Sequence, residues 1–580
     1  MTLKYKDAPP EQTIQKIKNI LKDIGINTKE LLYNNANLSH SCRIIINNDV
    51  LSELNVGTNG KGMTPVYSLA SGYAELMERL QNKSLLNEAI KHAIPSSTFQ
   101  LFPDEKEQTS SKANFISLIN TFFPNYQPKR YANELPEQIS WLGVPFANIT
   151  QKQVEVVPII LLRANSSTGM CAGNTPYEAI LQGINEIFER YVLQKLYLEK
   201  ITPPVYSPDY FKGTAIHSRL EKLVDMGYIY EVKDCSLGKG FPVIGLQLTN
   251  TNNGTITFRL GADLSPEIAL ERCFTEIFQG REQKDAFFTP IELDKPINIP
   301  KEYHRNLKNG TGRYPAEFFF ASPSYEFNEP VIMRTGDSQD DFHAMVDFLE
   351  RNGYSLLIRD HSFLGFPTYQ IIIPGLSDQH YKLNDILDDY IQYLNSNKPI
   401  WSLYRLKQLN KKELEQLPTI IEEKYPDEYL IKLFPYNTSS HNVINKDLLI
   451  FLIYIKLNDY ERAYKYFTSF LDFYKSKEAR YNDYLHCVRD YIYLKKNHEK
   501  DVNIRSALSK FYTTKKVDEV FSDFKSTQKI MKNYLFPECF DCENCPIKSS
   551  CHYKRVIQFA TQILNIQTIN RIYQDQLLTL

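Results

Sequence analysis

Apolar residues recur every three to four positions along several stretches of the first 400 residues, the spacing that places them on one face of an α-helix. The helices predicted in this way cover residues 11–24, 64–82, 176–199 and 265–282. Continuous apolar or β-rich runs predict strands at 43–50 and 157–164 and within 231–248 and 355–376. We therefore expect a mixed α/β domain over residues 1–400.

After residue 400 strand patterns become rare and helical spacing dominates, which predicts a second, all-helical domain over residues 401–580. In the stretch 458–471, Ala463 and Phe467 have the Ala-x-x-x-Phe spacing of one helix of a tetratricopeptide unit. A small residue at that place lets a neighbouring helix approach. The alternative is an ordinary helical bundle, and the sequence leaves both open.

Two features of the first domain occur twice. The pattern Gly-x-x-Glu-x-x-Glu-Arg is present at 72–79 and again at 183–190. An aspartate followed by a short loop and Gly-Phe-Pro is present at Asp234 and at Asp360. This recurrence predicts two related halves, although amphipathic helices can also resemble each other by chance.

The overall charge excludes a strong general attraction to nucleic acid or anionic membranes. The 580 residues carry a formal net charge of −1, with 42% hydrophobic and 23% charged residues, which is ordinary for a globular protein. The apolar run 448–455 is far shorter than the roughly 20 residues that cross a bilayer. Residues 1–13 lack the apolar core of a signal peptide. We therefore expect a cytoplasmic protein with no membrane segment.

The predicted helices carry acidic stripes on otherwise apolar sequence. In 176–199 the stripe steps by four, four and three residues and comprises Glu178, Gln182, Glu186 and Glu189. The helix 64–82 repeats the steps with Ser71, Glu75 and Glu78, and Arg272 and Glu276 lie one turn apart in 265–282. For a single helix a solvated face is the simpler interpretation, but three occurrences favour carboxylates that converge on a cation.

Convergent carboxylates with neighbouring arginines suit magnesium and a polyphosphate. Mg²⁺ prefers oxygen ligands and commonly combines a few carboxylates with phosphate oxygens, while guanidinium groups bind phosphate in bidentate fashion. A G-x-x-x-x-G-K phosphate loop is not formed, because Asn55 occupies the position of its first glycine. The segment GTNGKGM at 57–63 can still offer backbone N–H groups and Lys61 to a phosphate, or it is a plain turn.

These spaced motifs resemble the YcaO family. The resemblance rests on three motifs in the family's order, namely S-x3-E-x2-E-R at 71–79, E-x3-Q-x3-E-x2-E-R at 178–190 and R-x3-E at 272–276. It extends over residues 1–400. The chain length, the segment KDAPPEQT at 6–13 and the C-terminal extension look most like the stand-alone bacterial members.

The resemblance implies an ATP site between the motif helices, in which Mg²⁺ ions join the phosphates to glutamates. The implied magnesium ligands are Glu75, Glu78, Glu186 and Glu189. The implied nucleotide-site residues are Lys6, Thr13, Ser71, Asn174, Glu178, Gln182, Arg190, Arg272 and Glu276. No general base or other catalytic residue is assigned.

The resemblance also implies ATP-dependent activation of a backbone amide, in which a nucleophile adds to the carbonyl and its oxygen leaves as phosphate. The chain ends DQLLTL, without the proline-rich tail of azoline-forming members. Stand-alone members imply a role in β-methylthiolation of a small-subunit ribosomal protein. The expected partners are a polypeptide substrate, that ribosomal protein or a methylthiotransferase, and a homodimer stays open. The alternative is a non-catalytic ATP-binding accessory protein whose helical domain docks a modification enzyme.

Four of the nine cysteines cluster at 539–551, with the spacing C-x2-C-x2-C-x5-C. They are Cys539, Cys542, Cys545 and Cys551. This spacing suits a tetrahedral sulfur site and predicts either a structural Zn²⁺ or an iron–sulfur cluster, with unligated thiols as the alternative. The odd cysteine total argues for reduced thiols rather than a disulfide framework.

Overall fold

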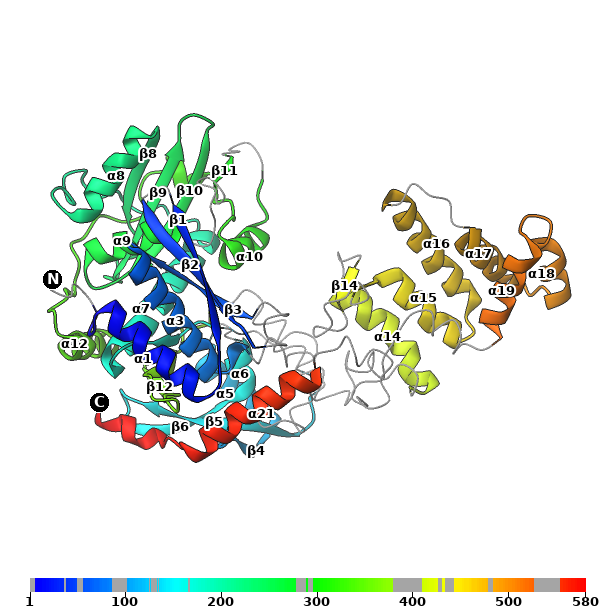
Figure 1. Ribbon diagram of the computed structural model, residues 1–580, viewed down its shortest axis with the longest axis horizontal. Coiled ribbons are helices and arrows are strands. Elements are labelled where there is room, and N and C mark those ends of the chain that lie inside the picture. The colour runs from blue at the N-terminus through cyan, green and yellow to red at the C-terminus, as the bar shows by residue number, and fades with distance from the viewer. Residues whose placement is uncertain are drawn as a thin grey trace. The chain divides into compact units, whose positions relative to one another are not determined.

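The fold is taken from a computed structural model of the chain (Figure 1). The structure describes residues 6–35, 38–48, 56–85, 102–124, 126, 133, 135–164, 167–277, 288–290, 296–378, 409–425, 430–432, 443–477, 483–525 and 553–580. The predicted cysteine site at 539–551 lies outside these residues and stays a prediction.

The chain divides into two compact units. The first comprises Met1–Glu88, Ile94–Asn395 and Phe559–Leu580, and the second comprises Ala89–Ala93 and Ser396–Gln558. The first unit mixes strands and helices, which confirms the predicted α/β class. In the part of the chain that the structure describes, no helix has the length and apolar character needed to cross a membrane.

The first unit contains three antiparallel sheets. One has the order β1–β2–β3, formed by Thr28–Asn35, Ser39–Ile46 and Gly57–Gly62. The second has the order β11–β10–β9–β8, formed by Thr289–Pro290, Thr255–Ala262, Val243–Asn250 and Tyr228–Asp234. The third has the order β4–β5–β12–β13–β7, formed by Lys106–Ser111, Gln138–Asn148, Leu357–Asp360, Thr368–Ile372 and Met170–Ala172, and β6 (Gln153–Pro158) pairs with β5.

The three helices that carry the acidic stripes each lie between two of these sheets. They are α3 (Pro65–Gln81), α7 (Pro176–Leu198) and α9 (Pro266–Ile277), close to the predicted bounds. Helix α3 packs on β2 and β3 and also on β7 and β13, whereas α7 packs on β7 and β13 and also on β9 and β10. Helix α9 packs on β9 and β10 and returns to β2 and β3. Sheets and helices therefore alternate around a closed ring.

Further helices cover this ring. In the first unit they are α1 (Pro10–Asp23), α5 (Lys112–Phe122), α6 (Ile159–Ala164), α8 (Ala215–Asp225), α10 (Ile299–Asn309), α11 (Glu317–Phe320) and α12 (Ser338–Arg351). Near the C-terminus follow α21 (Tyr553–Ile569) and the 3₁₀ helix η4 (Gln574–Thr579). Gln574 is buried and its side-chain amide both accepts from the Asp360 N–H at 2.7 Å and donates to the Asp360 carbonyl at 3.1 Å. The C-terminal residues are thus held against β12.

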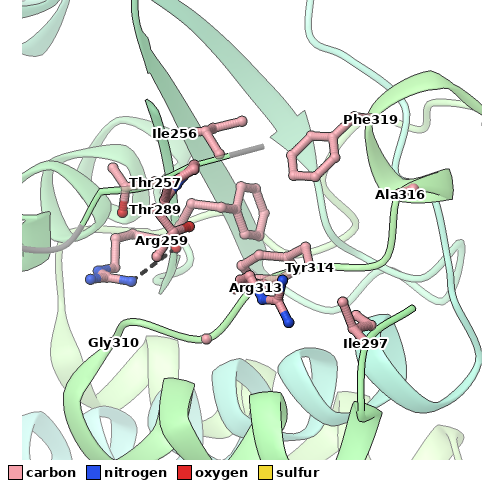
Figure 2. Close-up of a pocket in the computed structure, with 13 residues that line it drawn as sticks. Ile256, Thr257, Arg259, Thr289, Ile297, Gly310, Arg313, Tyr314, Ala316 and Phe319 are labelled. Atoms are coloured by element: carbon pink, nitrogen blue, oxygen red, sulfur yellow. Dashed lines mark hydrogen bonds between the residues drawn. The ribbon is translucent and has the colours of Figure 1, made fainter. Parts of the chain in front are cut away.

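A recess lies beside β10 and β11 (Figure 2). The buried Arg259 faces it, and its guanidinium donates to the Phe258 carbonyl at 3.1 Å and lies against Gly310. Gly310 ends α10 with φ 69°, a left-handed conformation that strains other residues, and a Cβ there would also come within 2.4 Å of the Arg259 Nη2 atom. Among the described residues that line this recess, none belongs to the predicted nucleotide site.

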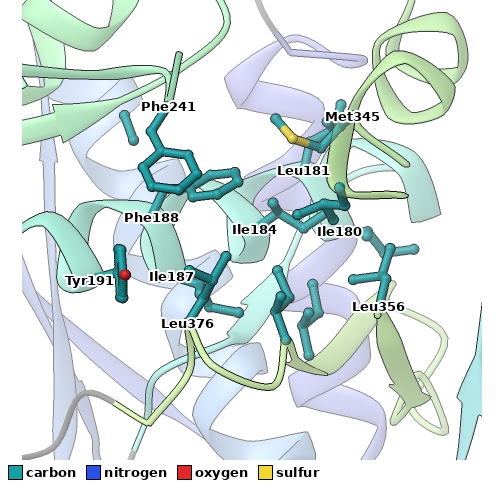
Figure 3. Close-up of a cluster of buried hydrophobic side chains, with 14 of the residues drawn as sticks. Ile180, Leu181, Ile184, Ile187, Phe188, Tyr191, Phe241, Met345, Leu356 and Leu376 are labelled. Carbon is teal, nitrogen blue, oxygen red and sulfur yellow. The ribbon is translucent and has the colours of Figure 1, made fainter. Parts of the chain in front are cut away.

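The apolar face of α7 forms the centre of the first unit's core (Figure 3). Ile180, Ile184 and Phe188 are fully buried, and the Phe188 ring stacks on Phe241 with centroids 4.8 Å apart. Helix α7 is therefore fixed by packing along the face opposite its carboxylates, which leaves the acidic stripe free to serve a ligand.

Glycines let α3 and α7 approach their strands closely. A Cβ at Gly72 of α3 would lie 2.8 Å from the Cys42 sulfur, and a Cβ at Gly183 of α7 would lie 2.8 Å from the Cys171 sulfur. Each glycine is the seventh residue after the proline that begins its helix. The repeated Gly-x-x-Glu pattern thus combines a packing position with an acidic one.

The repeated Asp and Gly-Phe-Pro segments form the same hairpin turn twice. The Asp234 carboxylate accepts from the Ser236 N–H at 2.9 Å after β8, and the Asp360 carboxylate accepts from the Ser362 N–H at 2.7 Å after β12. Gly-Phe-Pro then leads into β9 in one case and β13 in the other. Two sheets of the ring therefore share a hairpin that the sequence repeats.

The strand predicted at 157–164 is wrong over most of its length. Strand β6 ends at Pro158, and Ile159–Ala164 form the short helix α6. Proline has no N–H for a further sheet hydrogen bond, and a short apolar run does not distinguish a strand from a buried helix.

The second unit is mainly helical. Its helices are α14 (Lys411–Lys424), α15 (Lys446–Lys456), α16 (Tyr460–Lys477), α17 (Asp483–Lys496), α18 (Asp501–Leu508) and α19 (Thr514–Phe524). The all-helical prediction is corrected by a small hairpin of β14 (Leu430–Lys432) and β15 (Val443–Asn445), because these short segments satisfy their backbone groups by pairing. Ala463 and Phe467 are buried as their spacing predicts, but the tetratricopeptide likeness stays a prediction.

Candidate functional site

The three acid-bearing helices begin with the same local structure. A threonine or serine hydroxyl caps each helix by accepting an N–H three residues ahead, and a proline occupies the first helical position. The capping residues are Thr64, Thr175 and Ser265. Each cap follows a strand that ends two or three residues earlier, so β3–α3, β7–α7 and β10–α9 are equivalent units.

Because the three helices begin in the same way, residues at the same distance from the first proline occupy equivalent positions along each helix. The sixth residue after the proline is Ser71, Gln182 or Arg272, and the tenth is Glu75, Glu186 or Glu276. The thirteenth and fourteenth residues are Glu78 and Arg79 in α3, and Glu189 and Arg190 in α7. Because the helices lie in one ring, carboxylates at these positions of α3 and α7 influence one another's charge. We call Glu75, Glu78, Glu186, Glu189 and Glu276 the acidic cluster.

Direct contacts join α9 to α7 and to β3 at this cluster. Arg272 of α9 donates from Nη1 to the Gln182 side-chain oxygen of α7 at 2.6 Å. Lys61 of β3 forms an ion pair with Glu276 of α9. The structure thus places in contact Lys61 and Glu276, which lie 215 positions apart in the chain, and joins the predicted nucleotide-site residues Gln182 and Arg272.

The arginines pair mainly with carboxylates of their own helix. Arg79 lies 3.5 Å from both Glu75 and Glu78, and the Arg190 Nε atom lies 3.6 Å from the Glu186 Oε1 atom. The side chains keep part of their surface accessible, 31% for Glu75 and 13% for Glu78. A ligand can therefore reach the cluster without unfolding it.

Burial and neighbouring negative charge disfavour the charged forms of three carboxylates in the acidic cluster. Burial raises the pKa of Glu75, Glu78 and Glu189 above the ordinary range, and the negative charge of Glu186 raises all three further. Arginines and Lys61 counter this effect only in part. Carboxylates held this close favour either protons or an added cation.

Among the described residues, no group of three or more His, Cys, Asp or Glu side chains is gathered closely enough to hold a metal ion, so the fit for magnesium depends on the chemistry of the acidic cluster. The Glu186 Oε1 atom is buried and accepts no hydrogen bond from the described residues. Buried carboxylate oxygens usually find a partner, so this oxygen has an unused acceptor position. Several carboxylates, partial exposure and flanking arginines suit a hard divalent ion with phosphate oxygens.

A second group of predicted residues lies at the start of α7, around Glu178. Lys6 lies 3.3 Å from this carboxylate, the Asp7 N–H donates to it at 2.8 Å, and the Asn174 amide donates at 3.0 Å. Thr13 of α1 donates to the Asn174 side-chain oxygen at 2.7 Å. We call Lys6, Thr13, Asn174 and Glu178 the N-terminal cluster.

In the N-terminal cluster, the negative charge of Glu178 is stabilised by neighbouring donors and by Lys6. Burial alone would raise the pKa of Glu178, but the Lys6 charge, the Asp7 N–H and the Asn174 amide outweigh it and lower the pKa. Its members are in contact with one another through Glu178 and Asn174, as the family resemblance implies for neighbours in one site. Ser71 is half-buried on α3, at the position equivalent to Gln182.

Sequence reasoning missed two contributions. Lys61 was noted only as part of a weak phosphate loop, although it lies in the acidic cluster. Burial lowers its pKa to about 8 against the raising effect of Glu189. Asp7 was not assigned, but its side chain accepts from Thr175 and, at 2.5 Å, from Ser338. Alignment of the three helices gives no signal for Lys61, because the equivalent residues before α7 and α9 are Ala172 and Ala262.

The comparison with known families decides the identity. The family model described as YcaO cyclodehydratase, ATP- and Mg²⁺-binding, matches residues 59–377. This chain belongs to the YcaO family. The match covers β3 through β13 and so includes α3, α7 and α9, which confirms the resemblance inferred from the motifs.

Curated relatives support the assignment. An uncharacterized protein of Haemophilus influenzae is 30% identical over 417 residues, which are 68% of this chain and 68% of that protein. The ribosomal protein S12 methylthiotransferase accessory factor YcaO of Escherichia coli is 29% identical over 395 residues, 64% of this chain and 66% of that protein. A solved structure of YcaO from Methanopyrus kandleri, bound with AMPPCP and Mg²⁺, aligns with 65% of this chain and 93% of its own chain. The sequence identity is 16% and the TM-score is 0.41.

Proposed function

We propose that this YcaO protein binds Mg–ATP between α3, α7 and α9 and uses it to activate a carbonyl group of a polypeptide. One observation carries the proposal: equivalent positions of three helices carry five carboxylates, and the charge of Glu186 acts on Glu75, Glu78 and Glu189 at once. The proposed magnesium ligands are Glu75, Glu78, Glu186 and Glu189.

The two clusters fit the two ends of a nucleotide. Glu178 and Glu189 are eleven residues apart on α7, roughly 16 Å along the helix axis at 1.5 Å per residue. We assign the triphosphate to the acidic cluster, with Arg190, Arg272, Gln182 and Glu276 around it. The N-terminal cluster, with Lys6 and Thr13, is assigned to the nucleoside end, and Ser71 to a contact on α3.

ATP supplies the phosphoryl group that turns a carbonyl oxygen into a good leaving group. A nucleophile adds to the amide carbon, the oxygen takes the γ-phosphoryl group while its bond to ADP breaks, and the C–O bond then breaks to release phosphate. The arginines of the site neutralise charge that develops on the transferred group. No described residue is assigned as the general base.

The physiological setting follows from the E. coli relative, whose name links it to methylthiolation of ribosomal protein S12. We propose that the polypeptide is a ribosomal protein or a protein that modifies it. The same name, which says accessory factor, supports a second candidate: the protein binds Mg–ATP without chemistry and docks a methylthiotransferase through its helical unit.

Oxygen labelling tests the chemistry directly. A polypeptide substrate that carries ¹⁸O at its backbone carbonyls is incubated with the protein and Mg–ATP. We expect phosphate release that depends on the polypeptide, with ¹⁸O in the released phosphate and a changed polypeptide mass. Phosphate release without label transfer, seen only with an active methylthiotransferase, would instead support the accessory function.

A further inference from the structure

Lys61 is a single cation placed where the other two units of the ring have none. It lies four residues before the proline that begins α3, at the end of β3. The equivalent positions before α7 and α9 are Ala172 and Ala262, at the ends of β7 and β10. The ring therefore holds a lysine in one of three equivalent places.

The ammonium group of Lys61 contacts one carboxylate directly and is influenced by the charges of carboxylates on the other two helices. It is ion-paired with Glu276 of α9, and the charges of Glu189 and Glu186 of α7 and of Glu75 of α3 act on it. Arg272 is the cation that opposes it. A divalent ion bound by these carboxylates would face the same groups, so Lys61 and the ion compete for them.

We infer that Lys61 is the internal counter-cation of the acidic cluster. In the ligand-free protein its ammonium neutralises the carboxylates; when the nucleotide binds, the ammonium passes from Glu276 to the triphosphate and frees the carboxylates for Mg²⁺. This inference rests on the proposed Mg–ATP site. It adds a residue that couples the binding of Mg²⁺ to the binding of the nucleotide.

The exchange couples metal and nucleotide. Without nucleotide, Mg²⁺ must displace Lys61 from its partners, so it binds weakly. With nucleotide, the phosphate takes over the ammonium and removes the competitor. By linkage, each ligand then raises the affinity of the other by the same factor.

The test compares Lys61→Met and Lys61→Gln with the wild type, with Lys61→Arg as the charge-keeping variant. Lys29→Met is the matched control, because Lys29 is exposed on β1 of the same sheet. Two affinities are measured by calorimetry: Mg²⁺ alone, and the Mg²⁺ complex of a non-hydrolysable ATP analogue. Thermal shifts with Mg²⁺ alone provide a second readout.

The two affinities should move in opposite directions in Lys61→Met and Lys61→Gln. We expect Mg²⁺ alone to bind at least about five-fold tighter and the Mg–nucleotide complex at least about five-fold weaker. Weaker or unchanged binding of Mg²⁺ alone in both variants would overturn the inference. Tighter binding of Mg²⁺ alone by Lys61→Arg, to the extent seen in Lys61→Met, would also overturn it, because Lys61→Arg keeps the charge. Failure of the wild type to bind the Mg–nucleotide complex would instead overturn the proposed function.

Discussion

Two carboxylates on α7, one at the start of the helix and one further along it, have pKa values shifted in opposite directions. At its start, Glu178 accepts hydrogen bonds from the Asp7 N–H and the Asn174 amide and is paired with Lys6, and its pKa is lowered. Further along, Glu189 lies among other carboxylates, and burial raises its pKa. One helix therefore presents a completed polar cluster and an incomplete one.

The difference shows which contacts the protein supplies itself. The N-terminal cluster satisfies its carboxylate with its own donors, so it is prepared before any ligand arrives. The acidic cluster leaves a buried oxygen of Glu186 without a hydrogen bond from the described residues and relies on Lys61 and arginines for charge. The second arrangement agrees with the proposed binding of a cation, and the first agrees with a proposed positioning role.

Glu186→Ala is expected to have the largest effect on the acidic cluster. Because Glu186 raises the pKa of three neighbours and is a proposed metal ligand, Mg–ATP affinity should fall more than about 100-fold. The ligand-free variant should unfold at a higher temperature than the wild type, because like-charge repulsion is removed. Calorimetric titration and thermal unfolding measure both; unchanged affinity would contradict the account.

Glu178→Gln should give the opposite stability result. The substitution leaves the Lys6 charge without its partner and weakens buried hydrogen bonds, so unfolding free energy should drop by about 1–3 kcal/mol. Urea denaturation measures it, with Glu199→Gln at the exposed end of α7 as the control. A more stable Glu178→Gln variant, as expected for Glu186→Ala, would contradict the statement that the N-terminal cluster stabilises its carboxylate while the acidic cluster does not.

The pH dependence separates the clusters further. Glu75, Glu78 and Glu189 have raised folded-state pKa values, so the folded state binds more protons and unfolding free energy should rise as pH falls from 8 toward the ordinary value of 4.5. This contribution is lost as pH rises through the folded pKa. Glu178, with its lowered pKa, acts in the other direction and only below 4.5. Urea denaturation across pH should show this slope, and Glu186→Ala should flatten it.

Ser71→Ala should have the smallest effect. Ser71 occupies on α3 the position of Gln182 and Arg272, and losing one hydroxyl contact costs about 0.5–1.5 kcal/mol. Mg–ATP affinity should therefore fall only a few-fold, measured by the same titration. A loss of Mg–ATP affinity as large as that expected for Glu186→Ala would contradict the assignment of a single minor contact to Ser71.

The sequence predicted the helices well where caps and periodicity agree. Residues 64–82 and 176–199 correspond to Pro65–Gln81 and Pro176–Leu198, because proline starts and buried apolar faces are local properties. The apolar run 157–164 was assigned wrongly, since composition alone does not separate a strand from a short buried helix. The hairpin at β14 and β15 was missed for the same reason.

The closed ring could not be predicted from the sequence. It forms because each of α3, α7 and α9 packs on two different sheets, and the sequence does not indicate which pair of sheets each helix contacts. The acidic stripes indicated convergence, and the family resemblance supplied the residue roles. Neither could show that Glu178 is already satisfied by Lys6 and Asp7, or that Lys61 pairs with Glu276. These are long-range contacts that appear only after folding.

The most direct test of the account is the affinity for Mg–ATP of wild type, Glu189→Ala and the exposed control Glu199→Ala on the same helix, each checked for intact folding. We predict tight binding by the wild type and the control, and no measurable binding by Glu189→Ala. Equal binding by all three folded proteins would contradict the claim that carboxylates of separate helices hold magnesium and the triphosphate.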